Sequence, residues 1–167
     1  LLALGCGYGR TYSSDRLRYG RVILLMDADV DGHHISCLML ALFYKLLPQL
    51  IEEGRLFLAN PPLYKVVVGK QTLWADDVEH LELTLSKLSE PQRRNAQVSY
   101  FKGLGEMNPK TLFETSMDPA TRRLLQVTVP DGSELATQVM MEELMGPDAP
   151  RRLAHIEAFS PSTPVTA

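Results

Sequence analysis

Three aspartates, Asp27, Asp29 and Asp31, fall within the stretch MDADVDGHH, directly after the apolar run VILLM. Like charges this close repel each other unless a cation neutralises them. An apolar run without alternation is typical of a strand in a parallel sheet, and open α/β sheets place their sites at the carboxyl ends of such strands. Residues two apart on a strand point to one side. Asp27 and Asp29 would therefore present oxygen ligands together, which predicts a Mg²⁺ site.

Asp31 allows a second interpretation. It precedes the expected helix, where a carboxylate can cap the N-terminus, so a capping role and a metal-binding role are both open for it. An EF-hand loop shares the spacing of the aspartates but needs a glutamate at its twelfth position. Counted from Asp27, that position is Leu38, so the EF-hand interpretation fails.

One enzyme alternative remains. Haloacid-dehalogenase phosphatases use a strand that ends in Asp-x-Asp, with the first aspartate as nucleophile, and DADV fits that fragment. Such an enzyme also needs a later lysine and an acidic pair. Lys70 and the pair Asp76 and Asp77 are the candidates, although a hairpin and a helix start are expected where they lie.

The bulk composition sets limits on the class of protein. The chain has 167 residues, of which 45% are hydrophobic, enough for one ordinary domain with a core. The formal net charge of −3 does not suit a protein that holds DNA by bulk charge alone. Arg122 and Arg123 form one of several local basic clusters, which we expect at a surface or a subunit interface. The cysteines Cys6 and Cys37 have no metal-ligand spacing and are expected to be free thiols.

The elements that would position the aspartates can be read from the pattern. A strand is expected over 21–26 and a long helix over 34–53, whose apolar residues form one stripe, kinked at Pro48 and ended by Gly54. A strand over 55–59 would complete a strand–helix–strand crossover. The apolar stripe consists of Ile35, Leu38, Met39, Leu42, Phe43, Leu46, Leu47, Leu50 and Ile51.

Further elements are expected downstream. Gly69-Lys70 predicts a hairpin of strands 63–68 and 71–75, and Asp76 can cap a helix that runs to about residue 88. Capping residues before Pro109 and Pro119 predict two helix starts. The remaining expected elements are a strand over 98–101 that leads into KGLGE, a strand over 124–129, a helix over 133–145 and a short helix after residue 152.

The start of the chain is rich in glycine. Gly5, Gly7 and Gly9 alternate in LLALGCGYGR, which lacks the lysine of a phosphate-binding loop and a preceding strand. We interpret it as the end of a helix followed by a turn. Because the chain starts at Leu1 inside an apolar pattern, we expect it to be a piece of a longer protein. No apolar run approaches the length of a membrane span, and no signal peptide is visible.

Together these stretches resemble a known family. LLALGCGYG, LRYGRVILLMDADVDGHHI, LIEEGRLFLANPPLYKV, YFKGLGEMNP and MDPATRRLLQVTV are similar, in this order, to the TOPRIM region of the B subunits of bacterial type IIA topoisomerases, DNA gyrase and topoisomerase IV. The resemblance covers residues 1–146. The short separation between PPLYKV and YFKGLGEMNP favours the topoisomerase IV type, although some gyrases share it.

The resemblance implies a fold and a domain organisation. The fold class would be α/β: a Rossmann-like TOPRIM core with a mainly parallel sheet flanked by helices, and a C-terminal helical tail. The core would span 1–101 and include the hairpin 63–75, and the tail region would span 102–153. The polar, proline-rich end, 154–167, is expected to be disordered.

The resemblance also implies an activity. B subunits assist the A subunit's tyrosine in Mg²⁺-dependent cleavage and religation of double-stranded DNA, in an A2B2 assembly of the cytoplasm that hydrolyses ATP. Asp27 and Asp29 would be catalytic metal ligands, with Asp31 as a third, nearby acidic residue. Lys102 and His34 are candidates for contacts with DNA phosphates. For each of them a structural role is also open: an ion pair of Lys102 with Glu106 or another acidic residue, and a hydrogen bond at the helix start for His34.

The sequence departs from the family pattern in one respect that matters for the site. The family's metal-binding glutamate lies in an EGDSA-like stretch before LLALGCG, and ATP binds a further module; neither occurs in this sequence. We therefore expect half a metal site in this chain and no DNA cleavage by it alone, which leaves a docking module for DNA and the A subunit as the alternative. Glu106 is considered as a substitute ligand.

Overall fold

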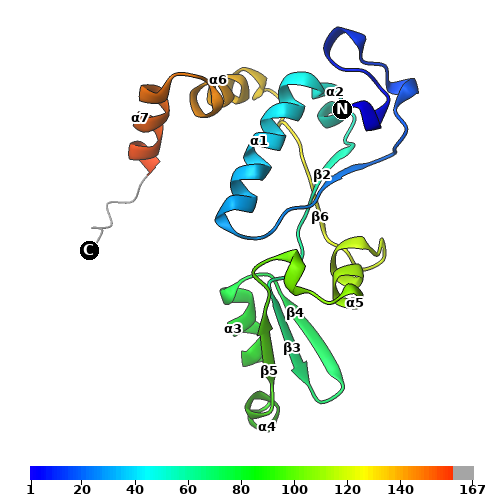
Figure 1. Ribbon diagram of the computed structural model, residues 1–167. Helices are drawn as coiled ribbons and strands as arrows, with labels where there is room; N and C mark the ends of the chain where they lie inside the picture. Colours follow the sequence, from blue (N-terminus) through cyan, green and yellow to red (C-terminus); the bar gives the residue numbers. More distant parts are fainter. Residues whose placement is uncertain (160–167) are drawn as a thin grey trace.

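The computed structural model describes residues 1–159 of the chain. In this part the chain forms a mixed α/β structure with two three-stranded sheets (Figure 1). The first sheet has the order β1-β2-β6 and the second β4-β3-β5. The α/β class expected from the sequence is thus confirmed.

The first sheet contains the expected crossover. β1 (Val22–Leu24) pairs in parallel with β2 (Leu56–Ala59), and the helices α1 (Val30–Leu46) and α2 (Pro48–Glu52) connect them. β6 (Leu124–Gln126) adds to β2 in the antiparallel direction. Among the described strands the parallel arrangement is therefore confined to β1 and β2, because the second sheet is antiparallel throughout.

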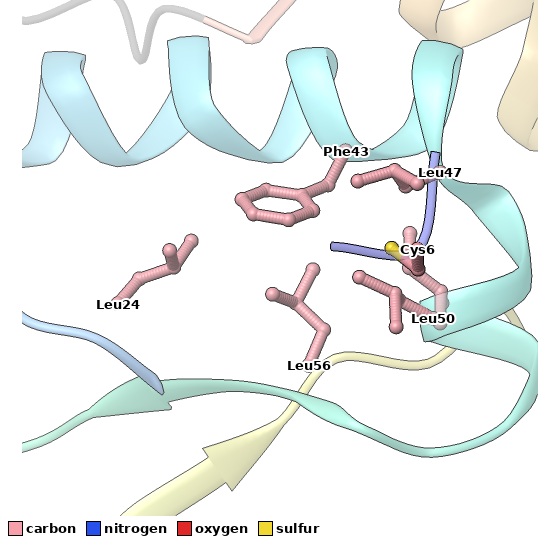
Figure 2. Packing of buried hydrophobic residues seen from close by; sticks show 7 residues of the cluster. Cys6, Leu24, Phe43, Leu47, Leu50 and Leu56 are labelled. Carbon is pink, nitrogen blue, oxygen red and sulfur yellow. The ribbon is translucent and has the colours of Figure 1, made fainter. Parts of the chain in front are cut away.

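The core lies between the helices α1 and α2 and the first sheet. Figure 2 shows Phe43 and Leu47 facing Leu56 of β2 across this space. Among the described residues, the buried members of this cluster are Cys6, Leu24, Phe43, Leu47, Leu50, Ile51 and Leu56. Each fully buried side chain of this size contributes about 1.5–3 kcal/mol, so this cluster is what holds α1 on the sheet.

The long helix differs from the expectation in two ways. It begins at Val30 rather than near residue 34, and it breaks at Leu47, whose φ of −140° leaves the helical region before Pro48 starts α2. Proline has no N–H for the helix ladder, so a break replaces the expected kink. The apolar stripe also divides: Phe43 and Leu47 are buried, whereas Ile35 and Leu42 are exposed.

The second sheet is a hairpin with one added strand. β3 (Tyr64–Val68) and β4 (Gln71–Ala75) are joined by the expected two-residue turn, in which Gly69 has a φ of 61°. β5 (Gln97–Tyr100) pairs with β3 on the other side. Two helices follow β4: α3 (Val78–Ser86) and α4 (Glu90–Arg94).

The cap of α3 is Asp77 and not Asp76, which the sequence predicts. The side chain of Asp77 accepts a hydrogen bond from the His80 amide at 2.7 Å and caps the helix. Asp76 instead forms an ion pair with Arg123, which lies beside β6. Arg123 therefore links the two sheets.

The N-terminal segment forms three short 3₁₀ turns, η1 (Leu2–Leu4), η2 (Gly9–Thr11) and η3 (Ser14–Arg16). Gly5, with a φ of 75°, ends the first of them, as the sequence predicts. Glu53 at the end of α2 anchors this segment: it accepts hydrogen bonds from the hydroxyls of Tyr12 at 2.9 Å and Ser14 at 3.0 Å.

After β5 the chain turns through η4 (Leu104–Glu106) into α5 (Pro109–Leu112), which Asn108 caps as expected. A π-helical turn, η5 (Phe113–Met117), continues α5. Asp118-Pro119 starts no helix: Asp118 accepts from the Ala120 amide at 2.9 Å and stabilises a turn instead.

Two helices, α6 and α7, end the described chain; they lie on the side of α1 that faces away from the sheets (Figure 1). α6 (Glu134–Met145) matches its expected range, and α7 (Ala149–Phe159) follows a short connection. Residues 154–159, which the composition predicts to be disordered, are thus helical, and α6 packs against α7. The rest of that predicted tail, 160–167, lies outside the described residues.

Candidate metal and nucleic-acid site

The site begins just beyond the carboxyl end of β1. Asp27 follows Leu24, the last residue of the strand, by three positions and is exposed. Its Oδ1 accepts a hydrogen bond from the backbone N–H of Leu104 at 2.8 Å, 77 residues further along the chain. The two motifs MDADVDGHH and KGLGE, distant in sequence, therefore meet at one place. Sequence reasoning expected both motifs to matter but did not predict this contact.

Two glycines permit this close approach. A Cβ at Gly32 would lie 2.0 Å from the backbone carbonyl oxygen of Asp27, which no real side chain tolerates. A Cβ at Gly103 would lie 3.3 Å from the Asp27 carboxylate. Gly32 thus fits the start of α1 tightly against the backbone of Asp27, and Gly103 brings the KGLGE turn onto its side chain.

Asp29 is the N-cap of α1. Its Oδ1 accepts from the Gly32 N–H at 2.8 Å, which satisfies one of the free amides at the helix start. The capping role considered for Asp31 is therefore wrong: Asp31 lies inside the first turn, exposed, because the helix begins earlier than expected. Strand alternation does not orient these side chains either, since β1 ends before Asp27.

The KGLGE turn is closed by its own glutamate. The Oε2 of Glu106 accepts the backbone N–H of Lys102 at 2.8 Å, and the Glu106 N–H donates to the Gly103 carbonyl at 3.1 Å. The alternative role considered for Lys102, an ion pair with Glu106 or another acidic residue, is not seen within the described residues, where Lys102 is exposed. His34 is likewise exposed on the first turns of α1.

The donors present are compatible with a hard divalent cation, although they are few. In both Asp27 and Asp29 the Oδ1 atom accepts a hydrogen bond from a backbone amide. The Oδ2 atom of each has no hydrogen-bond partner within residues 1–159. Carboxylate oxygens are the ligands that Mg²⁺ prefers. No group of three or more His, Cys, Asp or Glu side chains in the described part of the chain is arranged to hold a metal. The metal-binding roles of Asp27, Asp29 and Asp31 stay predictions.

Comparison with known proteins decides the family. The model of the carboxyl terminus of the DNA gyrase B subunit matches residues 93–157. The DNA gyrase B subunit of Thermotoga maritima is 41% identical over 94% of this chain, and the DNA topoisomerase 4 B subunit of Rickettsia bellii is 40% identical over 93%. The chain belongs to the family of gyrase and topoisomerase IV B subunits.

The matches cover unequal shares of this chain and its relatives. The DNA gyrase B subunit of Archaeoglobus fulgidus is 41% identical over 95% of the chain, which corresponds to 24% of that relative. The chain thus spans about a quarter of the length of the curated B subunits that it matches. Gyrase and topoisomerase IV relatives reach the same identity, so identity does not separate the two types.

Membership of the B-subunit family leaves no place for the phosphatase alternative. Its candidate acidic residues have other roles, because Asp77 caps α3 and Asp76 pairs with Arg123. Lys70 lies in the turn between β3 and β4, at the end of the second sheet that points away from α1 in Figure 1. No helix among the described residues is long and apolar enough to cross a membrane.

The sequence does not indicate two contacts between residues that lie far apart in the chain. One is the hydrogen bond from the Leu104 N–H to Asp27, which uses a backbone group that every residue except proline has. The Asp76–Arg123 pair joins residues 47 apart, and nothing in either local pattern indicated the partner.

Proposed function

We propose that this chain forms part of the Mg²⁺-dependent DNA cleavage and religation centre of an ATP-dependent type IIA topoisomerase, within the TOPRIM region of its B subunit. One observation carries the proposal. The carboxylate of Asp27, at the carboxyl end of a parallel strand, is oriented by the Leu104 amide, and Asp29 stands two residues further on.

The chain's own residues have distinct tasks in this proposal. Asp27 and Asp29 each direct one oxygen to backbone amides and offer the other to the metal. Asp31, exposed in the first turn of α1, would act through a bound water. When bound, Mg²⁺ would stabilise negative charge on the phosphate and on the leaving 3′-oxygen. A further carboxylate would come from another part of the full-length protein.

DNA contact is assigned to two exposed cationic or polar side chains beside the aspartates. The ammonium group of Lys102 has no ion-pair partner among the described residues, and the KGLGE turn holds its backbone next to Asp27. His34 is exposed about one turn after Asp29. Phosphate contacts of this kind orient a duplex without reading its sequence.

The whole assembly is part of the proposal. The tyrosine that attacks DNA would belong to an A subunit, two A and two B subunits would act on one duplex, and ATP would bind a separate module of the B subunit. Such an enzyme would work in the cytoplasm on chromosomal DNA.

The test uses the full-length B subunit with its A subunit. Asp27→Asn and Asp29→Asn each keep an acceptor for the backbone amide and remove the charge. We expect supercoil relaxation to fall at least roughly 100-fold while ATP hydrolysis is retained, as for loss of a major electrostatic contribution. Near-normal relaxation by both variants would refute the metal assignment.

A docking module without chemistry is the second candidate, because no three-ligand metal group occurs in residues 1–159. It predicts that this chain, mixed with the A subunit, binds DNA but gives no Mg²⁺-dependent cleavage. Cleavage that returns when the preceding part of the B subunit is supplied would assign chemistry to the whole protein and docking to this part.

A further inference from the structure

Asp27 is held by a turn that is itself held by one side chain. Leu104, whose N–H donates to the Asp27 carboxylate, is the first residue of the 3₁₀ turn η4. The last residue of that turn is Glu106, and its carboxylate reaches back to the backbone N–H of Lys102. The side chain of Glu106 therefore closes a ring around the amide that orients Asp27.

The turn has firm supports on both sides. Upstream, the Phe101 N–H donates to the Leu63 carbonyl at 2.8 Å at the end of the second sheet. Downstream, Met107 is buried, and the hydroxyl of the buried Thr115 donates to its sulfur at 3.6 Å. Between these supports, the backbone runs through two glycines, whose freedom must be restricted by other contacts. Glu106 supplies such a contact.

Glu106 is bound to the turn through both its side chain and its backbone. Its Oε2 accepts a hydrogen bond from the Lys102 amide. The Gly103 carbonyl accepts the N–H of Glu106 itself at 3.1 Å. Both ends of the residue are thus committed to the turn.

We propose that Glu106 is a positioning residue: it closes the KGLGE turn so that the Leu104 N–H fixes one oxygen of Asp27 and leaves the other for the metal. The part of this inference that concerns the metal rests on the proposed function. Outer contacts of this kind typically change metal affinity or activity by about 10–100-fold when they are removed. The carboxylate charge itself is not required, because an amide oxygen can accept the same hydrogen bond.

The test compares Glu106→Ala, Glu106→Gln and Glu114→Ala in the full-length B subunit with its A subunit. Glu114 is a matched control, since it is a nearby glutamate whose side chain pairs with Lys110 at the surface. The first readout needs no metal: amide hydrogen exchange of the segment 102–106. We expect faster exchange in Glu106→Ala than in the other two proteins.

The second readout is the Mg²⁺ concentration that gives half-maximal DNA cleavage. We expect Glu106→Ala to raise it by about 10-fold or more, and Glu106→Gln and Glu114→Ala to stay near the unmodified enzyme. Unchanged exchange and unchanged Mg²⁺ requirement in Glu106→Ala would overturn the positioning role. A loss in Glu106→Gln as large as that in Glu106→Ala would overturn it too, since charge would then be essential.

The variant Asp27→Asn separates failure of this inference from failure of the proposed function. If Asp27→Asn cleaves DNA normally, the proposed function is refuted, and so is the effect of Glu106 on metal binding. If it abolishes cleavage while Glu106→Ala leaves both readouts unchanged, the proposed function stands and the role of Glu106 is refuted.

Discussion

A glycine-to-alanine series tests the close approach on which the site depends. At Gly32 an added Cβ would lie 2.0 Å from the Asp27 carbonyl oxygen, whereas ordinary contact begins at 3.4 Å. The helix start and the backbone of Asp27 must then separate by about 1.4 Å, because neither atom belongs to a flexible side chain. At Gly103 the Cβ would be 3.3 Å from the Asp27 carboxyl carbon, a far smaller conflict.

Two effects on stability oppose each other at Gly32. Alanine within a helix is favoured over glycine by about 1 kcal/mol, whereas forcing atoms into a packed site costs about 1–3 kcal/mol. The net loss of unfolding free energy is therefore small, about 0–2 kcal/mol. The effect on activity should be larger than the effect on stability, since a displacement of about 1 Å among catalytic groups can reduce the rate about 100-fold.

Relaxation by the full-length enzyme and thermal melting of the same protein are the two assays. Gly105→Ala is the control, because a Cβ there meets nothing within 4 Å and its φ is not positive. We expect the activity loss to rank Gly32→Ala above Gly103→Ala, with Gly105→Ala near normal. Equal activity of Gly32→Ala and Gly105→Ala, with both proteins folded, would refute the close approach.

Three further outcomes are expected. Asp29→Ala removes the cap of α1 and should cost about 1 kcal/mol, a fall of roughly 2–4 °C in melting temperature, while Asp29→Asn should melt near the unmodified protein; equal melting of both variants would contradict the capping role. Burial and the hydrogen bond to Glu53 raise the pKa of Tyr12 above 10.0, so its contribution to stability is complete below pH 10.0 and is lost as pH rises through the higher folded-state value. Urea unfolding between about pH 9 and pH 11 should therefore show a smaller decline in Tyr12→Phe than in the unmodified protein, and parallel declines would count against the shift. Arg123→Met should lower the free energy of unfolding by about 0.5–1 kcal/mol through loss of the partly exposed pair with Asp76, and the double variant with Asp76→Asn should lose little more; additive losses would show that the two side chains do not interact.

Much of the local structure could be predicted because local residues determine it. The turn at Gly69-Lys70 needs a positive φ at its first position, and Asn108 before Pro109 provides both an acceptor and a preset φ. The apolar pattern predicts too late a start for α1, because its first residues, Val30 to His33, carry no apolar period. The cap therefore belongs to Asp29 and not to Asp31.

Contacts between distant segments could not be predicted in the same way. The exposure of Ile35 and Leu42 depends on what else covers α1, and periodicity alone marks them as members of one stripe with Phe43. The hydrogen bond from Leu104 uses a backbone amide, which every residue but proline has. The aspartates themselves were identified correctly as neighbours of a strand end, but their surroundings come from the other half of the chain.

The bond between Asp27 and Leu104 encloses β2 and the whole second sheet within one loop of the chain. Contacts between residues so far apart form only after the entropy of closing the intervening loop has been overcome, which makes them late events in folding. The last strand of the second sheet, β5, leads into the turn that carries Leu104, although this sheet supplies none of the three aspartates. A change in the β3–β4 hairpin that displaces β5 would move Leu104 and alter the orientation of Asp27, although it replaces none of the three aspartates.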